Sequence, residues 1–82
     1  MPASRLYDYY DAIDDFCVRL RALERDTWAD GLIDAKAGGS TSGEILSDTG
    51  ATLRSIVAEE TDGGLRAEAS SLLRECDALW RS

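Results

Sequence analysis

The sequence predicts an all-α fold, a compact bundle of four helices in the order long, short, long, long, joined by short loops. Two observations lead to this prediction. Apolar residues recur at spacings of three and four along most of the chain, which is the pattern of one helix face. No stretch alternates polar and apolar residues with the β-branched enrichment of a strand. Short loops place consecutive helices antiparallel, so residues 1–82 are expected to form one helical domain.

The first helix has the clearest pattern, over residues 5–23, and the other helices are expected to pack around it. It is expected to begin near Ser4, whose hydroxyl can accept a hydrogen bond from a free backbone N–H. The pattern continues to about Glu24 or Arg25. The predicted core face comprises Leu6, Tyr9, Tyr10, Ile13, Phe16, Cys17, Leu20 and Leu23. Such a face is stable in water only when other helices cover it.

The opposite side of this helix is acidic. It carries Asp8, Asp11 and Asp15, which we interpret as a solvated face. Asp15 stands four residues before Arg19, the favourable order for an ion pair within a helix. Tyr7 and Val18 lie on the flank between the apolar and acidic sides. They are interpreted either as ordinary rim residues or as part of a contact patch.

A second, short helix is predicted from Asp26 or Thr27, either of which can cap it, to Gly38. Its apolar side comprises Trp28, Ala29, Leu32, Ile33 and Ala37. Gly31 weakens this helix by about 1 kcal/mol relative to alanine. Gly38 is expected to end it in the left-handed conformation. No proline or glycine separates it from the first helix, so whether the two are continuous stays open at this point.

The third helix is predicted over residues 42–60, and Thr41 and Glu44 have the spacing of a capping box at its start. Its buried face comprises Ile45, Leu46, Thr49, Thr52, Leu53, Ile56 and Val57. Gly50 lies at the edge of this face and is interpreted either as a point of close helix approach or as chance. Glu60 falls on the apolar side, and we expect its carboxylate to reach solvent from a frayed helix end.

The fourth helix is predicted to run to about Trp80. Gly63 or Gly64 is expected to end the third helix, and Thr61 or Asp62 to cap the fourth. Its apolar face comprises Leu65, Ala69, Leu72, Leu73, Cys76, Leu79 and Trp80. Asp77 and Arg81 have the spacing of a second ion pair within a helix.

The charge of the chain bears on its partners. The net charge is −7, and residues 27–62 contain seven acids and two bases. Such a surface repels phosphate backbones, so we expect no nucleic-acid binding. It attracts a basic partner and speeds the encounter, although the charge can also serve solubility alone. No apolar run is long enough to cross a membrane, and no signal peptide is recognised, so we expect a soluble cytoplasmic protein.

The residues favour binding over catalysis. The chain has no histidine, which removes the usual base near neutral pH. Cys17 and Cys76 lie on apolar helix faces and are expected to be buried free thiols, without the histidine that activates a nucleophile or completes a zinc site. The glycine-rich loop 38–43 lacks the lysine of a phosphate-binding loop. We therefore expect no enzyme activity, catalytic residue, cofactor or metal.

The sequence favours a non-enzymatic protein–protein interaction domain, with inhibition of a basic partner as one role. Bacterial immunity proteins and other toxin inhibitors are of this general size and charge, a comparison by class and not by motif. The predicted partner-binding residues are Asp30, Asp34, Glu44, Asp48, Tyr7 and Tyr10. The alternative is a homodimer that shares Trp28 or Trp80 between its subunits; otherwise both tryptophans are expected in the core.

Overall fold

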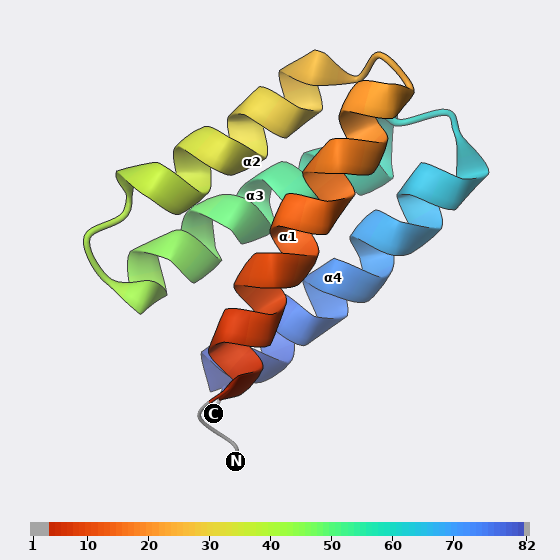
Figure 1. The fold of residues 1–82 in the computed structure, drawn as a ribbon. Helices are drawn as coiled ribbons and strands as arrows, with labels where there is room; N and C mark the ends of the chain where they lie inside the picture. Colours follow the sequence, from red (N-terminus) through yellow and green to blue (C-terminus); the bar gives the residue numbers. More distant parts are fainter. Residues whose placement is uncertain (1–3, 82) are drawn as a thin grey trace.

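The computed structural model describes residues 4–81, with Ser4 as backbone only, and these residues form four helices (Figure 1). The helices are α1 (Ser4–Ala22), α2 (Asp26–Gly38), α3 (Ser42–Glu59) and α4 (Gly63–Arg81). The described residues contain no strand. The predicted all-α bundle of four helices is therefore confirmed, including its long, short, long, long order. The capping role expected of the Ser4 side chain lies outside the described residues.

The helices pack as a closed ring around one core. Contacts join α1 to α2, α2 to α3, α3 to α4, and α4 back to α1. The start of α1 and the end of α4 lie at the same end of the bundle, as expected for four helices that alternate in direction (Figure 1). The molecule measures 33 × 22 × 20 Å. Each helix therefore has one face toward the core and one outer face toward solvent.

All four helices contribute to the core, and α1 contributes more buried apolar residues than any other helix. The buried apolar residues are Tyr9, Ile13, Phe16, Cys17, Leu20, Ala29, Leu32, Leu46, Leu53, Ile56, Leu65, Ala69 and Cys76. Trp28 is half-buried and packs against this cluster. Both thiols are buried and free, as expected.

Four residues of the predicted apolar faces are exposed instead, namely Leu23, Ile33, Ala37 and Trp80. Leu23 lies beyond the end of α1, in the turn, where the chain has left the helical path. Ile33 lies at the edge of the α2 apolar side, and Trp80 occupies the last turn of α4, where 58% of its surface stays exposed. Each residue continues the apolar pattern of its helix, but it lies at an edge or an end that the neighbouring helices do not cover.

The breaks between helices differ in part from expectation. Glu24 has a φ of 62° and ends α1, so α1 and α2 are separate helices. Arg25 precedes α2 and no side-chain hydrogen bond caps that helix, so the caps expected from Asp26 or Thr27 are wrong. Gly38 is the last helical residue and has no positive φ, so its expected left-handed stop is also wrong.

The predicted capping box at the start of α3 is confirmed. The Glu44 backbone N–H donates to Thr41 Oγ1 at 3.2 Å, and Ser40 Oγ donates to Glu44 Oε1 at 2.7 Å. Hydrogen bonds from Ser40 and Thr41 lower the pKa of the Glu44 carboxyl. Asp62 caps α4 by accepting from the Leu65 N–H at 2.9 Å, as predicted. Gly63 and Gly64, by contrast, open α4 and do not end α3.

Replacing glycine by alanine should have opposite effects on the free energy of unfolding at two positions. A Cβ added at Gly31 in α2 would meet Thr52 of α3 at 3.5 Å, an ordinary van der Waals contact. We expect Gly31→Ala to raise the free energy of unfolding by about 0.5–1 kcal/mol, because alanine is the better helix former.

A Cβ at Gly39 would lie 2.7 Å from the Ile45 side chain and 3.0 Å from its backbone nitrogen. Gly39→Ala should therefore lower the unfolding free energy. Urea denaturation checks both, and a Gly31→Ala protein less stable than the parent would contradict the α2–α3 packing.

A pair of hydrogen-bonded hydroxyl groups, those of Tyr9 and Thr49, lies in the core. Tyr9 Oη and Thr49 Oγ1 lie 2.7 Å apart, and the Thr49 hydroxyl is also 2.7 Å from the Ile45 carbonyl oxygen. A threonine hydroxyl has one proton, so Thr49 donates to Ile45 and accepts from Tyr9. Burial raises the pKa of Tyr9, which keeps its hydroxyl protonated as the donor. The pair joins α1 to α3 at the centre of the bundle.

This donor assignment predicts unequal effects of two substitutions. Thr49→Val removes the Thr49 oxygen that accepts from the buried Tyr9 hydroxyl and should cost about 1–3 kcal/mol of unfolding free energy. Tyr9→Phe leaves Thr49 bonded to Ile45 and should cost about 1 kcal/mol. The double variant should be more stable than the sum of the two costs implies. Chemical denaturation of all four proteins measures this, and a larger loss for Tyr9→Phe would reverse the donor assignment.

Candidate functional site

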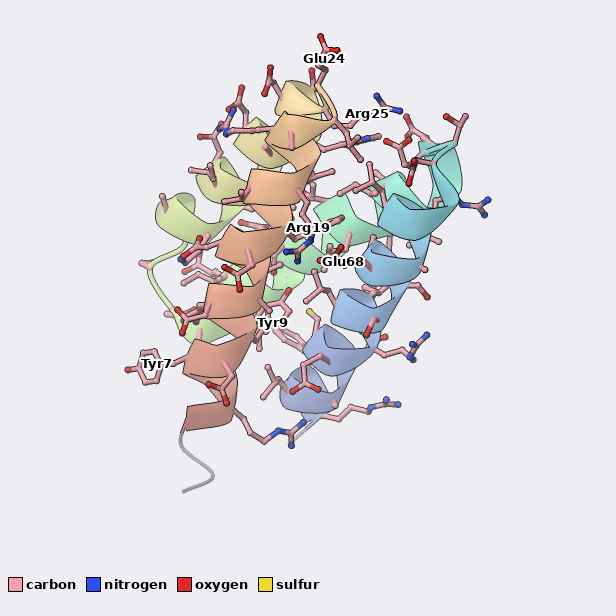
Figure 2. All side chains as sticks on the ribbon, turned by 45° about the vertical axis from the view of Figure 1, so that its right-hand side comes forward. Tyr7, Tyr9, Arg19, Glu24, Arg25 and Glu68 are labelled. Carbon is pink, nitrogen blue, oxygen red and sulfur yellow. The ribbon has the colours of Figure 1, made fainter. Side chains whose placement is uncertain are left out.

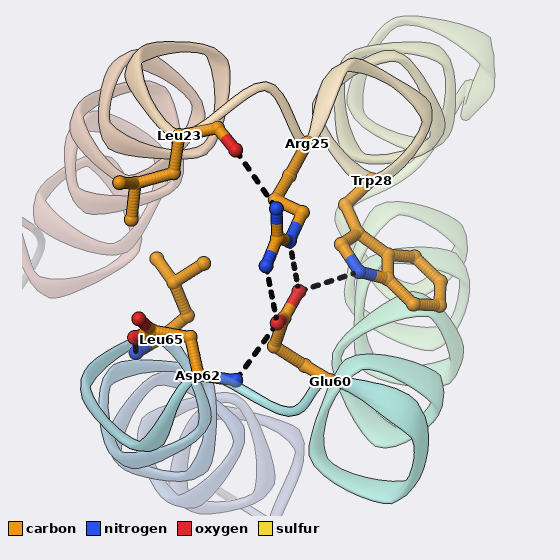
Figure 3. A network of polar contacts seen from close by, with 6 residues as sticks. All are labelled: Leu23, Arg25, Trp28, Glu60, Asp62 and Leu65. Atoms are coloured by element: carbon orange, nitrogen blue, oxygen red, sulfur yellow. Dashed lines mark hydrogen bonds and ion pairs between the residues drawn. The ribbon is translucent and has the colours of Figure 1, made fainter.

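The most buried charged group of the described residues is the Glu60 carboxylate, at the end of the bundle where two turns meet (Figure 3). Its side chain is 2% exposed. Arg25 donates to it through Nε at 2.9 Å and Nη2 at 3.2 Å. Trp28 Nε1 donates at 3.2 Å, and the Asp62 backbone N–H donates at 2.9 Å. The expectation of a frayed, solvated Glu60 is therefore wrong, because these donors hold the carboxylate inside.

This network joins the α1–α2 turn to the α3–α4 turn. Arg25 also donates to the Leu23 carbonyl at 2.9 Å, which ties it to the end of α1. Hydrogen bonds from Arg25 lower the pKa of Glu60 to about 2, and the Asp62 amide adds to the effect. The Glu60 carboxylate in turn raises the pKa of Arg25. A carboxylate that already accepts these bonds has a structural role and is a poor candidate for general acid–base chemistry.

Stability should fall when Glu60 is protonated. Its folded-state pKa of about 2 lies below the ordinary value of 4.5. The stabilisation is therefore complete above about pH 5 and is lost as the pH falls toward 2. Glu60→Gln should lower the Tm at pH 7 and reduce the difference in Tm between pH 7 and pH 3. Thermal denaturation followed by circular dichroism measures both. The exposed neighbour Glu59, as Glu59→Gln, is the matched control and should keep the parent pH dependence.

The six predicted partner-binding residues fall on two sides of the bundle. Tyr7, Tyr10 and Asp30 lie on the side where α1 meets α2. The Tyr7 and Tyr10 rings contact edge to face, 6.1 Å between centroids, and Tyr7 points away from the bundle (Figure 2). Lys36 of α2 lies 5.9 Å from the centre of the Tyr10 ring. Asp30 pairs with Arg21 at 2.8 Å, so part of its charge is already balanced.

The other three predicted residues lie toward α3. Asp34 is exposed on α2, and Asp48 is exposed on α3. Gly31 faces Thr52 across the antiparallel α2–α3 pair, and by helical geometry Asp34 and Asp48 occupy turns that lie beside each other. Glu44 accepts the hydrogen bonds of the capping box at the start of α3. The structure thus brings the six residues into two groups and not into one continuous site.

Exposed apolar residues extend the first of these groups. Val18 is 68% exposed and Tyr7 is 67% exposed, both on the outer side of α1. Ile33 of α2 borders a shallow hollow with Asp14, Lys36 and Ala37. We call the surface formed by Tyr7, Tyr10, Val18, Asp30 and Ile33 the α1–α2 face. The sequence does not decide whether Val18 is a rim residue or part of a contact patch, and it predicts Ile33 in the core. The reason is that periodicity alone does not locate the edge of a helix contact.

The ion pairs divide the surface charge unevenly. Within the described part of the chain, every cation before α4 forms an ion pair; these are Arg5, Arg19, Arg21, Arg25, Lys36 and Arg54. Arg19 pairs with Glu68 of α4 (Figure 2), and the expected pair with Asp15 is not formed. Asp77 likewise pairs with Arg54 of α3 instead of Arg81. Both expected pairs within one helix are replaced by pairs between helices.

Many carboxylates of α1 to α3 consequently have no ion pair among residues 4–81. They are Asp8, Asp11, Asp15, Glu24, Asp34, Glu44, Asp48, Glu59 and Asp62. Asp8, Asp11 and Asp15 share the outer side of α1, beside Tyr7 and Val18. The α1–α2 face is therefore bordered by unpaired carboxylates along α1, whereas Arg21 and Lys36 lie in ion pairs on its α2 side.

Neither a membrane span nor a metal cluster is found in the described part of the chain. None of its four helices combines the length and apolar character needed to cross a bilayer. No three side chains among the histidine, cysteine, aspartate and glutamate residues searched are grouped to hold a metal ion. Burial raises the pKa of both Cys17 and Cys76, which favours the unreactive thiol form.

Comparison of the chain with protein-family models, curated proteins and solved structures finds no match.

Proposed function

We propose that this protein is a small acidic interaction domain that binds a basic protein partner through the α1–α2 face. The observation that carries this proposal is the exposure of Tyr7 and Val18 on the side of α1 whose aspartates, at positions 8, 11 and 15, have no ion pair among the described residues. Isolated exposed apolar residues are common, but aromatic and aliphatic side chains grouped inside a charged rim resemble an interface core. A basic partner would bring lysines or arginines to the rim and apolar side chains to the centre.

The two kinds of residue contribute differently to such a complex. The carboxylates of Asp8, Asp11 and Asp15 raise the association rate by attracting a cationic surface over a distance. The apolar residues contribute to residence time, because water is released from their surfaces on contact. Inhibition of a basic enzyme is one role that suits this arrangement, since an acidic domain can cover a cationic active site.

Several features support a binding role over catalysis. The chain contains no histidine, the two thiols are buried with raised pKa values, and Glu60 is saturated by donors. Two free cysteines are also typical of a reducing compartment, so we include a cytoplasmic location in the proposal.

The test is affinity capture with tagged protein from the native cell extract, followed by binding measurements with the purified partner. We expect one basic protein to be recovered at low salt and depleted at moderate salt. Tyr7→Ala and Val18→Ala should each weaken its binding by about fivefold or more, mainly through faster dissociation. Trp80→Ala is the matched control, because Trp80 is an exposed apolar residue of α4, outside this face, and its removal should leave the affinity unchanged.

Charge reversal separates the local contact from the overall field. Asp11→Lys and Glu59→Lys change the net charge of −7 by the same amount, but only Asp11 borders Tyr7 and Val18. Both should slow association slightly, and only Asp11→Lys should also speed dissociation. The predicted residues Asp30, Asp34, Glu44 and Asp48 are reversed in turn by the same method. Recovery of an acidic partner, or equal effects of all reversals, would contradict docking at the α1–α2 face.

One observation favours the alternative of a homodimer. Trp80 is largely exposed, and a symmetric pair of subunits could share it. Sedimentation velocity at low and high salt decides between the two states. A monomer at all concentrations supports the first proposal, whereas a dimer that is insensitive to salt and lost in Trp80→Ala would support the alternative.

A further inference from the structure

The α4 helix differs from the rest of the molecule in its charge. Its three carboxylates are all taken by arginines of neighbouring helices: Glu75 by Arg5, Glu68 by Arg19, and Asp77 by Arg54. Its own arginines, Arg66, Arg74 and Arg81, form no ion pair among the described residues. All three are exposed. A protein of net charge −7 therefore has a locally basic helix.

The helical spacing places these cations on one side. At about 100° per residue, positions 74 and 81 lie about 80° and about 60° round the helix from position 66, so the three arginines form a broad stripe along α4. Arg66 donates to the Val57 carbonyl at 3.2 Å, which places its end of the stripe beside α3. Arg54 of α3 lies on the same side, and its contact with Asp77 is long, at 3.5 Å. An incoming carboxylate can therefore compete for Arg54 at little cost.

A hollow with a mixed polar and apolar lining lies between α3 and α4. It has a volume of about 210 Å³ and is lined by Leu46, Gly50, Arg54, Cys76, Asp77 and Trp80, with Ser47 at its edge. Glycine keeps it open, because a Cβ on Gly50 would lie 3.3 Å from Cys76 Sγ. The Trp80 ring forms one wall, and Gly43 would place a Cβ 3.6 Å from it. Cavities of about 150 Å³ accept a benzene ring, so this hollow has room for one large apolar side chain.

We propose that the α3–α4 groove, defined by this hollow and the arginine stripe, binds an acidic protein segment that inserts one aliphatic or aromatic side chain beside Trp80. The arginines attract the carboxylates of the segment, and Trp80 supplies the apolar anchor contact. A nucleic acid is a poor occupant, because the charge of the whole domain repels a phosphate backbone. A second copy docked symmetrically would bring two arginine stripes together. The groove is separate from the α1–α2 face, so this proposal does not depend on the basic partner.

The test uses a labelled glutamate-rich peptide with one central leucine. One control peptide has serine in place of the leucine, and the other has lysine in place of the glutamates. Binding is followed by fluorescence anisotropy and by ¹H–¹⁵N spectra of the full chain. The chain has two tryptophans, so it gives two indole signals. The Trp80 signal should shift on addition of the leucine peptide, while that of Trp28, bonded to Glu60, should stay in place. The serine and lysine peptides should bind more weakly.

Variants on the two sides of the molecule provide matched controls. Trp80→Ala should weaken binding of the leucine peptide by about fivefold or more, and Tyr7→Ala should leave it unchanged. Arg74→Gln should weaken it by about two- to fivefold, while Arg21→Gln on the α1–α2 side, the same chemical change, should not. Circular dichroism verifies that each variant keeps its helix content. Trp80→Phe keeps an aromatic wall and should retain most of the affinity.

Any one of the following results would overturn the proposal: no binding of the leucine peptide, shifts confined to α1 and α2, equal binding of the lysine peptide, or binding to anionic lipid vesicles as strong as to the peptide. Self-association that is lost in Trp80→Ala would also overturn it, because the groove would then be occupied by a second copy. Absence of leucine-peptide binding would leave capture of a basic partner by the α1–α2 face unaffected, so the two proposals can fail separately.

Discussion

Ion pairs between elements are the constraint on which the surface of this small bundle depends. Every cation before α4, within the described residues, binds a carboxylate of another helix or turn. The most buried of these pairs, Arg25 with Glu60, ties together both turns at one end. Exposed pairs contribute little individually to stability. Their larger effect is on which charges stay unpaired. Among the described residues, the pairs involve all the cations before α4 and all the carboxylates of α4.

The remaining charges lie on different sides of the molecule. Among residues 4–81, unpaired carboxylates are found on α1, α2, α3 and the turns, whereas the arginines without an ion pair are all on α4. Exposed apolar residues accompany each sign, with Tyr7 and Val18 among the acids and Trp80 beside the arginines. Apolar area supplies binding energy and charge selects the partner, so each side has both elements of an interaction surface. A domain of this kind can contact a basic and an acidic partner at once.

The sequence predicts the fold well, because four amphipathic periods with turn residues between them leave few other arrangements. Helix ends are predicted where side-chain chemistry is local, as at Thr41 and Asp62. Predictions fail where partners come from elsewhere in the chain. The sequence predicts a solvated Glu60 because its partner Arg25 lies 35 positions away. Arg19 likewise pairs with Glu68 of α4 and not with Asp15 of its own helix. The separation of unpaired carboxylates from unpaired arginines could not be predicted for the same reason, because the net charge of residues 63–82 does not show which groups form ion pairs.

The division of charge gives the surface two sides of opposite electrostatic potential. Paramagnetic relaxation enhancement with a cationic and an anionic nitroxide of equal size measures this potential at each backbone amide. We expect the cationic probe to act more strongly on amides around Asp11 and Val18. We expect the anionic probe to act more strongly around Arg74 and Arg81, despite the net charge of −7. A preference for the cationic probe over the whole surface, α4 included, would show that the charges are not divided in this way.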